Sequence, residues 1–229
     1  MPKAKNSKSR VPAARSNPSL SEQAFGRLEE LIITLQLPPG SLWSEATLSE
    51  MLDIGRTPVR EAVQRLADYH MVVIMRRHGI RIAEINEQEQ LLVLETRREL
   101  ERLIAGRAAR RASAEEKKSL SAMARALLAA GLRGDVTEML RHYFVAKAFM
   151  AGCAGNRFAA QAIAPLYTLS RRFYFMHHEE LNNMVEVARI HADLLRAVAT
   201  GDEEEAAAAS DRQIDFAESF TKRIITRDF

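Results

Sequence analysis

The chain has 229 residues, 47% of them hydrophobic and 28% charged, and this length and composition predict a folded protein of one or two domains. No apolar run approaches the roughly 20 residues that span a bilayer, and a lone cysteine, Cys153, cannot form an internal disulfide, so we expect a cytoplasmic protein with no membrane partner. The net charge of +3 does not indicate a basic folded body, because residues 1–18 hold five basic side chains and no acidic one.

The first segment, residues 1–18, is rich in serine, proline and alanine and shows no hydrophobic periodicity. We therefore expect a disordered basic tail. Such a tail serves either as a solubilising leader or as an arm that adds contacts to DNA phosphates, and the sequence leaves both roles open.

Residues 19–85 predict a first domain that begins with helices. Ser19 opens a capping-box sequence, and apolar residues follow it at helical intervals until the Pro-Pro-Gly run at 38–40. A second helix is expected after Ser44, which is suited to the N-cap position, and Gly55 is expected to end that helix in a left-handed conformation.

A third helix and a hairpin complete this domain. Thr57 is a suitable N-cap for the helix and Pro58 fits its first position. One face of the helix is apolar and consists of Val59, Val63 and Leu66. The β-rich runs 71–75 and 79–83 then predict two short strands joined by a basic turn, which together form a wing.

The third helix has the chemistry of a helix that reads DNA. Arginine donates two hydrogen bonds to guanine, and glutamine pairs in the same way with adenine. The face opposite the apolar stripe presents Arg56, Thr57, Arg60 and Gln64. The wing adds candidate contacts to phosphates or to a neighbouring groove at Arg76, Arg77, His78 and Gly79. We predict that these eight residues bind DNA.

Residues 86–229 show helical periodicity and no strand pattern. Helix-breaking sequences near 112–113, 131–134, 152–156, 177–179 and 201–202 divide this region into about six helices. Short loops between long amphipathic helices predict an antiparallel bundle. The expected fold class is mainly α, with an N-terminal winged helix-turn-helix followed by an all-α bundle.

The run from Arg56 to Ala62, Arg-Thr-Pro-Val-Arg-Glu-Ala, together with Pro39-Gly40 and Leu48-Ser49 before it, resembles the signature of the GntR family of transcription regulators. The resemblance implies a homodimeric repressor or activator that binds double-stranded DNA at a short palindromic operator. Of the two we expect a repressor, although the sequence leaves the sign of regulation open. Residues 86–229 resemble the FCD domain, the effector-binding half of the FadR-like branch, in Arg97 to Glu101, Gly155-Asn156 and His191 to Asp202.

Many FCD domains hold a divalent metal through one aspartate and three histidines. When the chain is aligned on Gly155-Asn156 and Asp202, the resemblance places these ligand positions at Tyr143, Lys147, His191 and Gln213. Only His191 retains a ligand, and a protonated lysine has no lone pair to offer, so we expect no metal. The alternative is a zinc or nickel site in a shifted register that uses Glu138 and His142, but the shift turns this pair about 140° away from the bundle interior.

Lys147 lies in an apolar stretch at 144–150. Either its stem packs there while its ammonium reaches water, or it is a buried cation that holds the carboxylate of a small organic acid. The resemblance to FCD domains also implies that Arg97 occupies a position whose side chain commonly points into the same pocket. We predict an effector site formed by Arg97, Tyr143, Lys147, His191 and Gln213, with a core role for His191 as the alternative. Whether Arg171 and Arg172 line this pocket or a dimer surface stays open.

Other classes of protein fit the sequence less well. An enzyme is not expected, because no nucleophile–base set, phosphate-binding loop or HExxH pair occurs. An architectural or RNA-binding protein would need a broadly basic body or aromatic stacking platforms. The sequence therefore predicts a DNA-binding regulator whose operator affinity is controlled by a small carboxylate-bearing metabolite.

Overall fold

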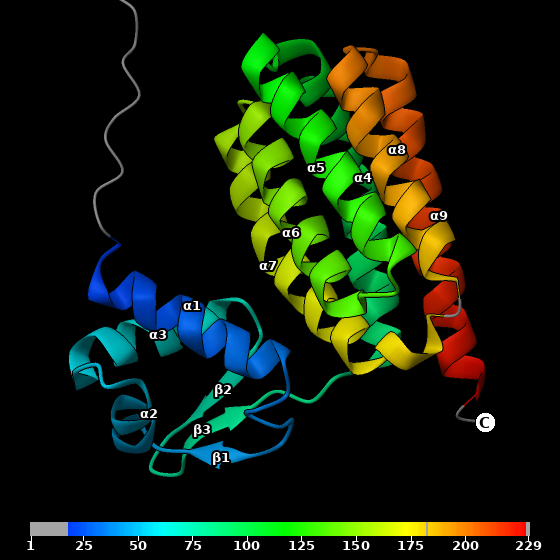
Figure 1. Ribbon diagram of the computed structural model, residues 1–229. Coiled ribbons are helices and arrows are strands. Elements are labelled where there is room, and N and C mark those ends of the chain that lie inside the picture. Colours follow the sequence, from blue (N-terminus) through cyan, green and yellow to red (C-terminus); the bar gives the residue numbers. More distant parts are fainter. Residues whose placement is uncertain (1–17, 182, 228–229) are drawn as a thin grey trace, which may run out of the picture.

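The computed structural model describes residues 18–181 and 183–227, so the tail predicted over 1–18 lies outside the described residues except for Pro18. The elements from α1 to β3, here called the head, form one body, and the helices from α4 to α9, here called the bundle, form a second (Figure 1). The chain between β3 and α4 connects them. Within the described residues, none of the helices combines the length and the apolar character that a bilayer crossing requires.

The head is a winged helix-turn-helix. Its elements are α1 (Leu20–Ile33), β1 (Leu42–Trp43), α2 (Glu45–Leu52), α3 (Arg56–Asp68), β2 (Val72–Met75) and β3 (Gly79–Ile82). The two predicted strands pair in antiparallel fashion, and β1, which was not predicted, pairs with the outer side of β3. Through this pairing, β1 connects the segment before α2 to the wing.

The predicted caps are correct for the first two helices. The Ser19 side chain accepts a hydrogen bond from the Glu22 amide in a complete capping box, and the Ser44 side chain accepts one from the Thr47 amide. The apolar stripe of α3 is buried against α1, so its predicted orientation is confirmed. This orientation turns the opposite face of α3 to solvent.

The predicted junction between α2 and α3 is wrong by two residues. Asp53, not Gly55, takes the left-handed conformation that ends α2, with φ of 52°, because aspartate tolerates that region. Gly55 is the N-cap of α3 and the helix begins at Arg56, so Thr57 lies inside the first turn and is not the cap. Pro58 follows in that same turn, where its missing N–H needs no helical partner.

Over the described residues 87–181 and 183–227, the bundle consists of six long helices, as predicted, with one short 3₁₀ turn. The helices are α4 (Glu87–Arg111), α5 (Ala114–Leu132), α6 (Val136–Cys153), α7 (Arg157–Met176), α8 (Met184–Thr200) and α9 (Glu203–Arg227), and the turn is η1 (His178–Glu180). Helix α4 packs mainly against α9 and also contacts α6, α7 and α8, so it runs through the centre of the bundle. Side chains on α4 are therefore well placed to meet those of several other helices.

Helix α7 carries the polar contacts between bundle and head. The Thr168 hydroxyl donates to the Glu29 carboxylate at 2.7 Å, and Arg171 forms an ion pair with Glu30. Both carboxylates belong to α1. Arg172 donates to the carbonyl oxygen of Ala83, in the segment between the two bodies. The two arginines that the sequence left unassigned thus face the head rather than the bundle interior.

Candidate functional site

The outer face of α3 is a polar, exposed surface. It presents the predicted side chains Arg56, Thr57, Arg60 and Gln64, all of them exposed. Helical spacing places them on consecutive turns, so a single face holds both of the arginines and the glutamine. The geometry agrees with a helix that can lie in a DNA major groove.

The wing tip brings three further predicted residues to the surface. Arg76, Arg77 and His78 form the turn between β2 and β3 and are exposed. Gly79 also has a structural reason to be glycine, while its predicted contact with DNA stays a prediction. Its φ is +94°, and a Cβ atom there would lie 2.5 Å from the Trp43 carbonyl oxygen, so glycine is required by the pairing of β1 with β3.

The sequence analysis missed one side chain that contacts the exposed face of α3. Glu45, at the first position of α2, accepts hydrogen bonds from Arg60 at 3.0, 3.1 and 2.8 Å. This ion pair, with the charge of Arg56 nearby, lowers the pKa of Glu45. No sequence signal identifies the pair, because the two residues lie on different helices whose relative placement decides the contact.

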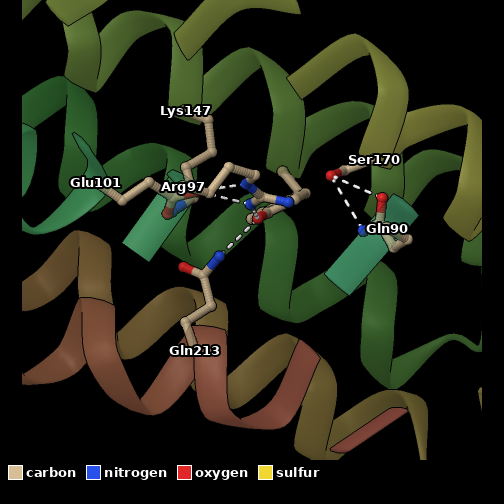
Figure 2. Close-up of polar contacts among 7 residues, drawn as sticks. Gln90, Arg97, Glu101, Lys147, Ser170 and Gln213 are labelled. Carbon is tan, nitrogen blue, oxygen red and sulfur yellow. Dashed lines mark hydrogen bonds and ion pairs between the residues drawn. The ribbon is translucent and has the colours of Figure 1, made fainter. Parts of the chain in front are cut away.

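A second polar site lies inside the bundle, and its centre is an ion-paired cluster of Arg97, Glu101 and Lys147 (Figure 2). The Arg97 Nε atom donates to the Glu101 carboxylate at 2.7 Å, and the Lys147 ammonium donates to the other oxygen of the same carboxylate. The three side chains are at most 2% exposed. Lys147 therefore does not extend to water, and the first of its two predicted roles is wrong. Its buried ammonium is paired with Glu101, and a contact with an effector carboxylate stays a prediction.

The other predicted site residues surround this cluster. The Tyr143 hydroxyl accepts hydrogen bonds from Arg97 at 3.0 Å and from Gln213 at 2.5 Å, and the Tyr143 ring stacks on His191 with centroids 4.1 Å apart. Four helices, α4, α6, α8 and α9, thus bring the five predicted residues together. The five residues meet inside the bundle, while their role as an effector site stays a prediction.

Glu101 was missed as a member of this site. It lies one helical turn after Arg97, a spacing that usually marks a solvent-exposed ion pair on a helix surface. Although burial acts to raise its pKa, the charges of Arg97 and Lys147 hold that pKa below its usual value. Glu101 is therefore the anion that allows two cations to be buried.

Burial changes the protonation of the neighbouring groups. Loss of hydration lowers the pKa of Lys147 to about 8, against the partly compensating charge of Glu101. Burial, together with the charge of Lys147, lowers the pKa of His191 to about 3, so its imidazole is neutral at physiological pH. The site at pH 7 consequently contains two cations, one carboxylate and a neutral histidine.

Several polar atoms around the cluster lack a hydrogen-bond partner among the described residues. They are Arg97 Nη1, Tyr167 Oη, His191 Nδ1 and Gln213 Oε1. Buried polar groups are nearly always paired, so this concentration of unpaired atoms needs an explanation. The adjoining cavity, lined in part by Tyr143, His191 and Gln213, measures about 10 Å³, close to the space that one water molecule needs.

These residues do not fit a divalent metal. A tyrosine, an ion-paired lysine and an amide occupy three of the four ligand positions, and only His191 offers an imidazole. Across residues 18–181 and 183–227, no group of three or more potential His, Cys, Asp or Glu ligands is found. The alternative pair, Glu138 and His142, is wrong as a bundle site, because Glu138 is held at the surface by Arg133 and Arg141.

Comparison with known proteins agrees with both halves of this description. The gntR model of bacterial regulatory proteins matches residues 20–82, and the FCD domain model matches residues 92–216. The chain is 28% identical over 156 residues to the HTH-type transcriptional repressor GlaR of Escherichia coli K12, which covers 65% of this chain and 70% of that protein.

Solved structures share the fold. E. coli McbR/YncC superposes with a TM-score of 0.79 at 18% identity, over 91% of this chain and 100% of that one. A GntR protein from Rhodococcus sp. RHA1 superposes with a TM-score of 0.67 at 18% identity, over 89% and 98% of the two chains. Domains and relatives are those of transcriptional regulators and not of enzymes. The chain belongs to the GntR family of transcriptional regulators, with the FadR-like arrangement of an N-terminal DNA-binding domain and a C-terminal FCD domain.

Proposed function

We propose that this regulator is a homodimeric repressor whose affinity for a palindromic operator is controlled by a small carboxylate bound in the bundle. The observation that carries the effector part is the buried Arg97–Glu101–Lys147 cluster, in which two cations share one carboxylate. An uncompensated buried charge is costly, and an anionic ligand would remove that cost. A carboxylate is favoured because its two oxygens could accept charge-assisted hydrogen bonds from the unpaired Arg97 Nη1 atom and from the Lys147 ammonium.

The unpaired atoms support the same ligand. Arg97 Nη1 is a donor, and the neutral His191 ring and the Gln213 amide can each supply a donor or an acceptor after reorientation. A cavity of about 10 Å³ is too small for an organic acid, so binding requires the surrounding side chains to move. Because these side chains belong to α4, α6, α8 and α9, their movement on binding could also change how the helices pack.

Helix α7 is the route that we propose from this site to the head. Tyr167 of α7 lies over the Arg97 guanidinium at 5.3 Å, and the next residue, Thr168, bonds to Glu29 of the head. Pro165, inside α7, lacks the N–H of a regular helical bond, and proline weakens and kinks a helix at such a position. Displacement of Tyr167 would therefore alter the part of α7 that holds α1.

At the DNA, each head of the dimer would place α3 in the major groove of one half-site. Arg56, Arg60 and Gln64 would contact base edges, Thr57 would contact the backbone, and Arg76, Arg77 and His78 would lie along phosphates. Since phosphate contacts release counterions, operator affinity is expected to fall steeply with salt.

Calorimetric titration tests the effector part, with lactate, succinate and benzoate as probes at pH 7. We expect at least one of these carboxylates to bind, and Lys147→Met to weaken that binding at least ten-fold, on the order of one charge-assisted hydrogen bond. Arg102→Met is the matched control, because Arg102 lies on α4 with its ion pair to Asp211 at the surface.

Fluorescence polarisation with DNA from the regulator's own promoter tests the operator part. Binding should depend on sequence and on salt, and the bound carboxylate should change it. Carboxylate binding that Lys147→Met leaves intact would contradict the effector site. Promoter binding without sequence dependence would contradict the operator.

A further inference from the structure

The ion pair between Glu45 and Arg60 joins the two helices of the DNA-binding unit. Glu45 is the first residue of α2, and Arg60 projects from the exposed face of α3. Arg60 Nε donates to both carboxylate oxygens at 3.0 and 3.1 Å, and Arg60 Nη2 donates to one of them at 2.8 Å. The Glu45 carboxylate therefore accepts hydrogen bonds from one edge of the Arg60 guanidinium, the edge formed by Nε and Nη2.

The ion pair with Glu45 leaves a defined set of hydrogen-bond donors on the other edge of the Arg60 guanidinium. A guanidinium carries five N–H groups in a fixed plane, and Glu45 uses the Nε–H and one Nη2–H. Within the described part of the chain, the two Nη1 hydrogens and the second Nη2 hydrogen have no protein acceptor, and the Arg60 side chain is 63% exposed. An Nη1–Nη2 pair is the fork that guanine accepts at O6 and N7.

Glu45 is itself held in place. It follows the N-cap Ser44, and the amino end of α2 favours a negative charge at this position. Its side chain is 34% exposed, about half the exposure of Arg60, so it is the more buried partner of the pair. A long side chain that would otherwise sample many rotamers is thus fixed before it meets DNA.

We propose that Glu45 is a specificity-determining residue, which fixes Arg60 to read one guanine and whose negative charge weakens binding to DNA of any sequence. The inference rests on the proposed placement of α3 in the major groove. Glu45 is expected to have two separate effects on DNA binding. Glu45 strengthens discrimination at one base pair through Arg60, and it opposes the sequence-independent attraction between the head and phosphates.

The experiment measures operator and non-specific affinities of the full chain by fluorescence polarisation at several salt concentrations. Arg60→Ala first identifies the G·C pair that Arg60 reads, as the position where substitution by A·T no longer costs affinity. Glu45→Gln keeps the shape of the side chain and removes its charge. Glu50→Gln is the matched control, because it removes the same charge from the exposed side of α2 at a residue outside the ion pair.

We expect Glu45→Gln to reduce discrimination at that base pair by roughly ten-fold, which is the scale of one bidentate contact, and to tighten binding to non-specific DNA. The double variant Glu45→Gln/Arg60→Ala should lose no more discrimination than Arg60→Ala alone. Glu50→Gln should leave discrimination unchanged. Circular dichroism melting of each variant verifies that the head is folded.

Two results would overturn the inference. Discrimination that survives Glu45→Gln would show that Arg60 needs no support, and an equal loss on operator and non-specific DNA would show that Glu45 only stabilises α2. If Arg60→Ala leaves operator affinity unchanged, the proposed placement of α3 itself is wrong, and this outcome is distinct from the other two.

Discussion

At the scale of single residues, the buried lysine has a measurable signature. The pKa of Lys147 is lowered to about 8 by loss of hydration, while lysine in an unfolded chain has a pKa near 10.5. Between these values the unfolded chain holds a proton that the folded protein has released. Stability must therefore increase with pH across this window, and the cost of the buried charge is complete below pH 8.

Urea unfolding at pH 7.5, 8.5 and 9.5 measures this effect. Between the lowest and the highest of these pH values, the wild-type protein should gain on the order of 2 kcal/mol relative to Lys147→Met, because other titrating groups are common to both proteins. A difference between the two proteins that stays constant with pH would show that the folded lysine keeps its proton throughout the window.

The structural role of a residue was predicted well where a local sequence pattern determines it. It was predicted poorly where the role depends on how distant parts of the chain pack together. The inward stripe of α3 follows from its own spacing. Glu101 was missed because an Arg–Glu pair one turn apart looks the same in sequence whether it is exposed or buried. Gly55 was assigned a left-handed conformation that Asp53 adopts, and both residue types tolerate that region.

At the scale of elements, the contact between α5 and α8 depends on one glycine. A Cβ atom at Gly131 would lie 2.4 Å from the Ala188 Cβ atom and 3.1 Å from the Met184 carbonyl oxygen. Neither neighbour is the end of a flexible side chain, so the helices would have to separate. The close approach explains why glycine, a poor helix former, stands inside α5.

Gly131→Ala is expected to destabilise the protein by about 1–3 kcal/mol, as overpacking does, although alanine favours helix. Gly152→Ala in α6 is the control, because nothing lies within 4 Å of a Cβ atom there, and it should be neutral or slightly stabilising. Thermal unfolding of both variants measures the difference. Equal stabilities would show that the two helices separate without cost.

Elements were predicted from their periodicity and caps, and the six bundle helices match that prediction. Strand β1 escaped prediction because two residues carry no alternation, and its existence depends on β3 as partner. The same limit applies to the Glu45–Arg60 pair, which joins α2 to α3 across 15 positions of sequence.

At the scale of the whole molecule, the proposed coupling between ligand and DNA passes through contacts of α7 with α1. Thr168→Val combined with Arg171→Met removes both polar contacts to α1 and leaves the bundle cluster intact. The partly exposed ion pair contributes at most about 1 kcal/mol, and the hydrogen bond from the buried Thr168 to a carboxylate contributes about 1–3 kcal/mol, so thermal unfolding must verify that the double variant stays folded. Carboxylate affinity should persist, while the effect of the carboxylate on operator affinity should decrease several-fold.

Arg157→Met is the control for this coupling experiment, because Arg157 lies at the other end of α7, over Phe158. Calorimetry and fluorescence polarisation give the two affinities for each variant. An unchanged ligand effect in the double variant would exclude these contacts as the route, and a lost carboxylate affinity would show that they support the bundle site directly.

The contact between Arg172 and Ala83 differs in kind from the other two contacts of α7, because its acceptor is a main-chain oxygen. Side-chain partners such as Arg171 and Glu30 constrain each other's identity, so in an alignment of relatives their positions should vary together. Any residue at position 83 offers the same oxygen to Arg172. This link between the domains should therefore leave no covariation in the evolutionary record, and a map of coupled positions would omit it.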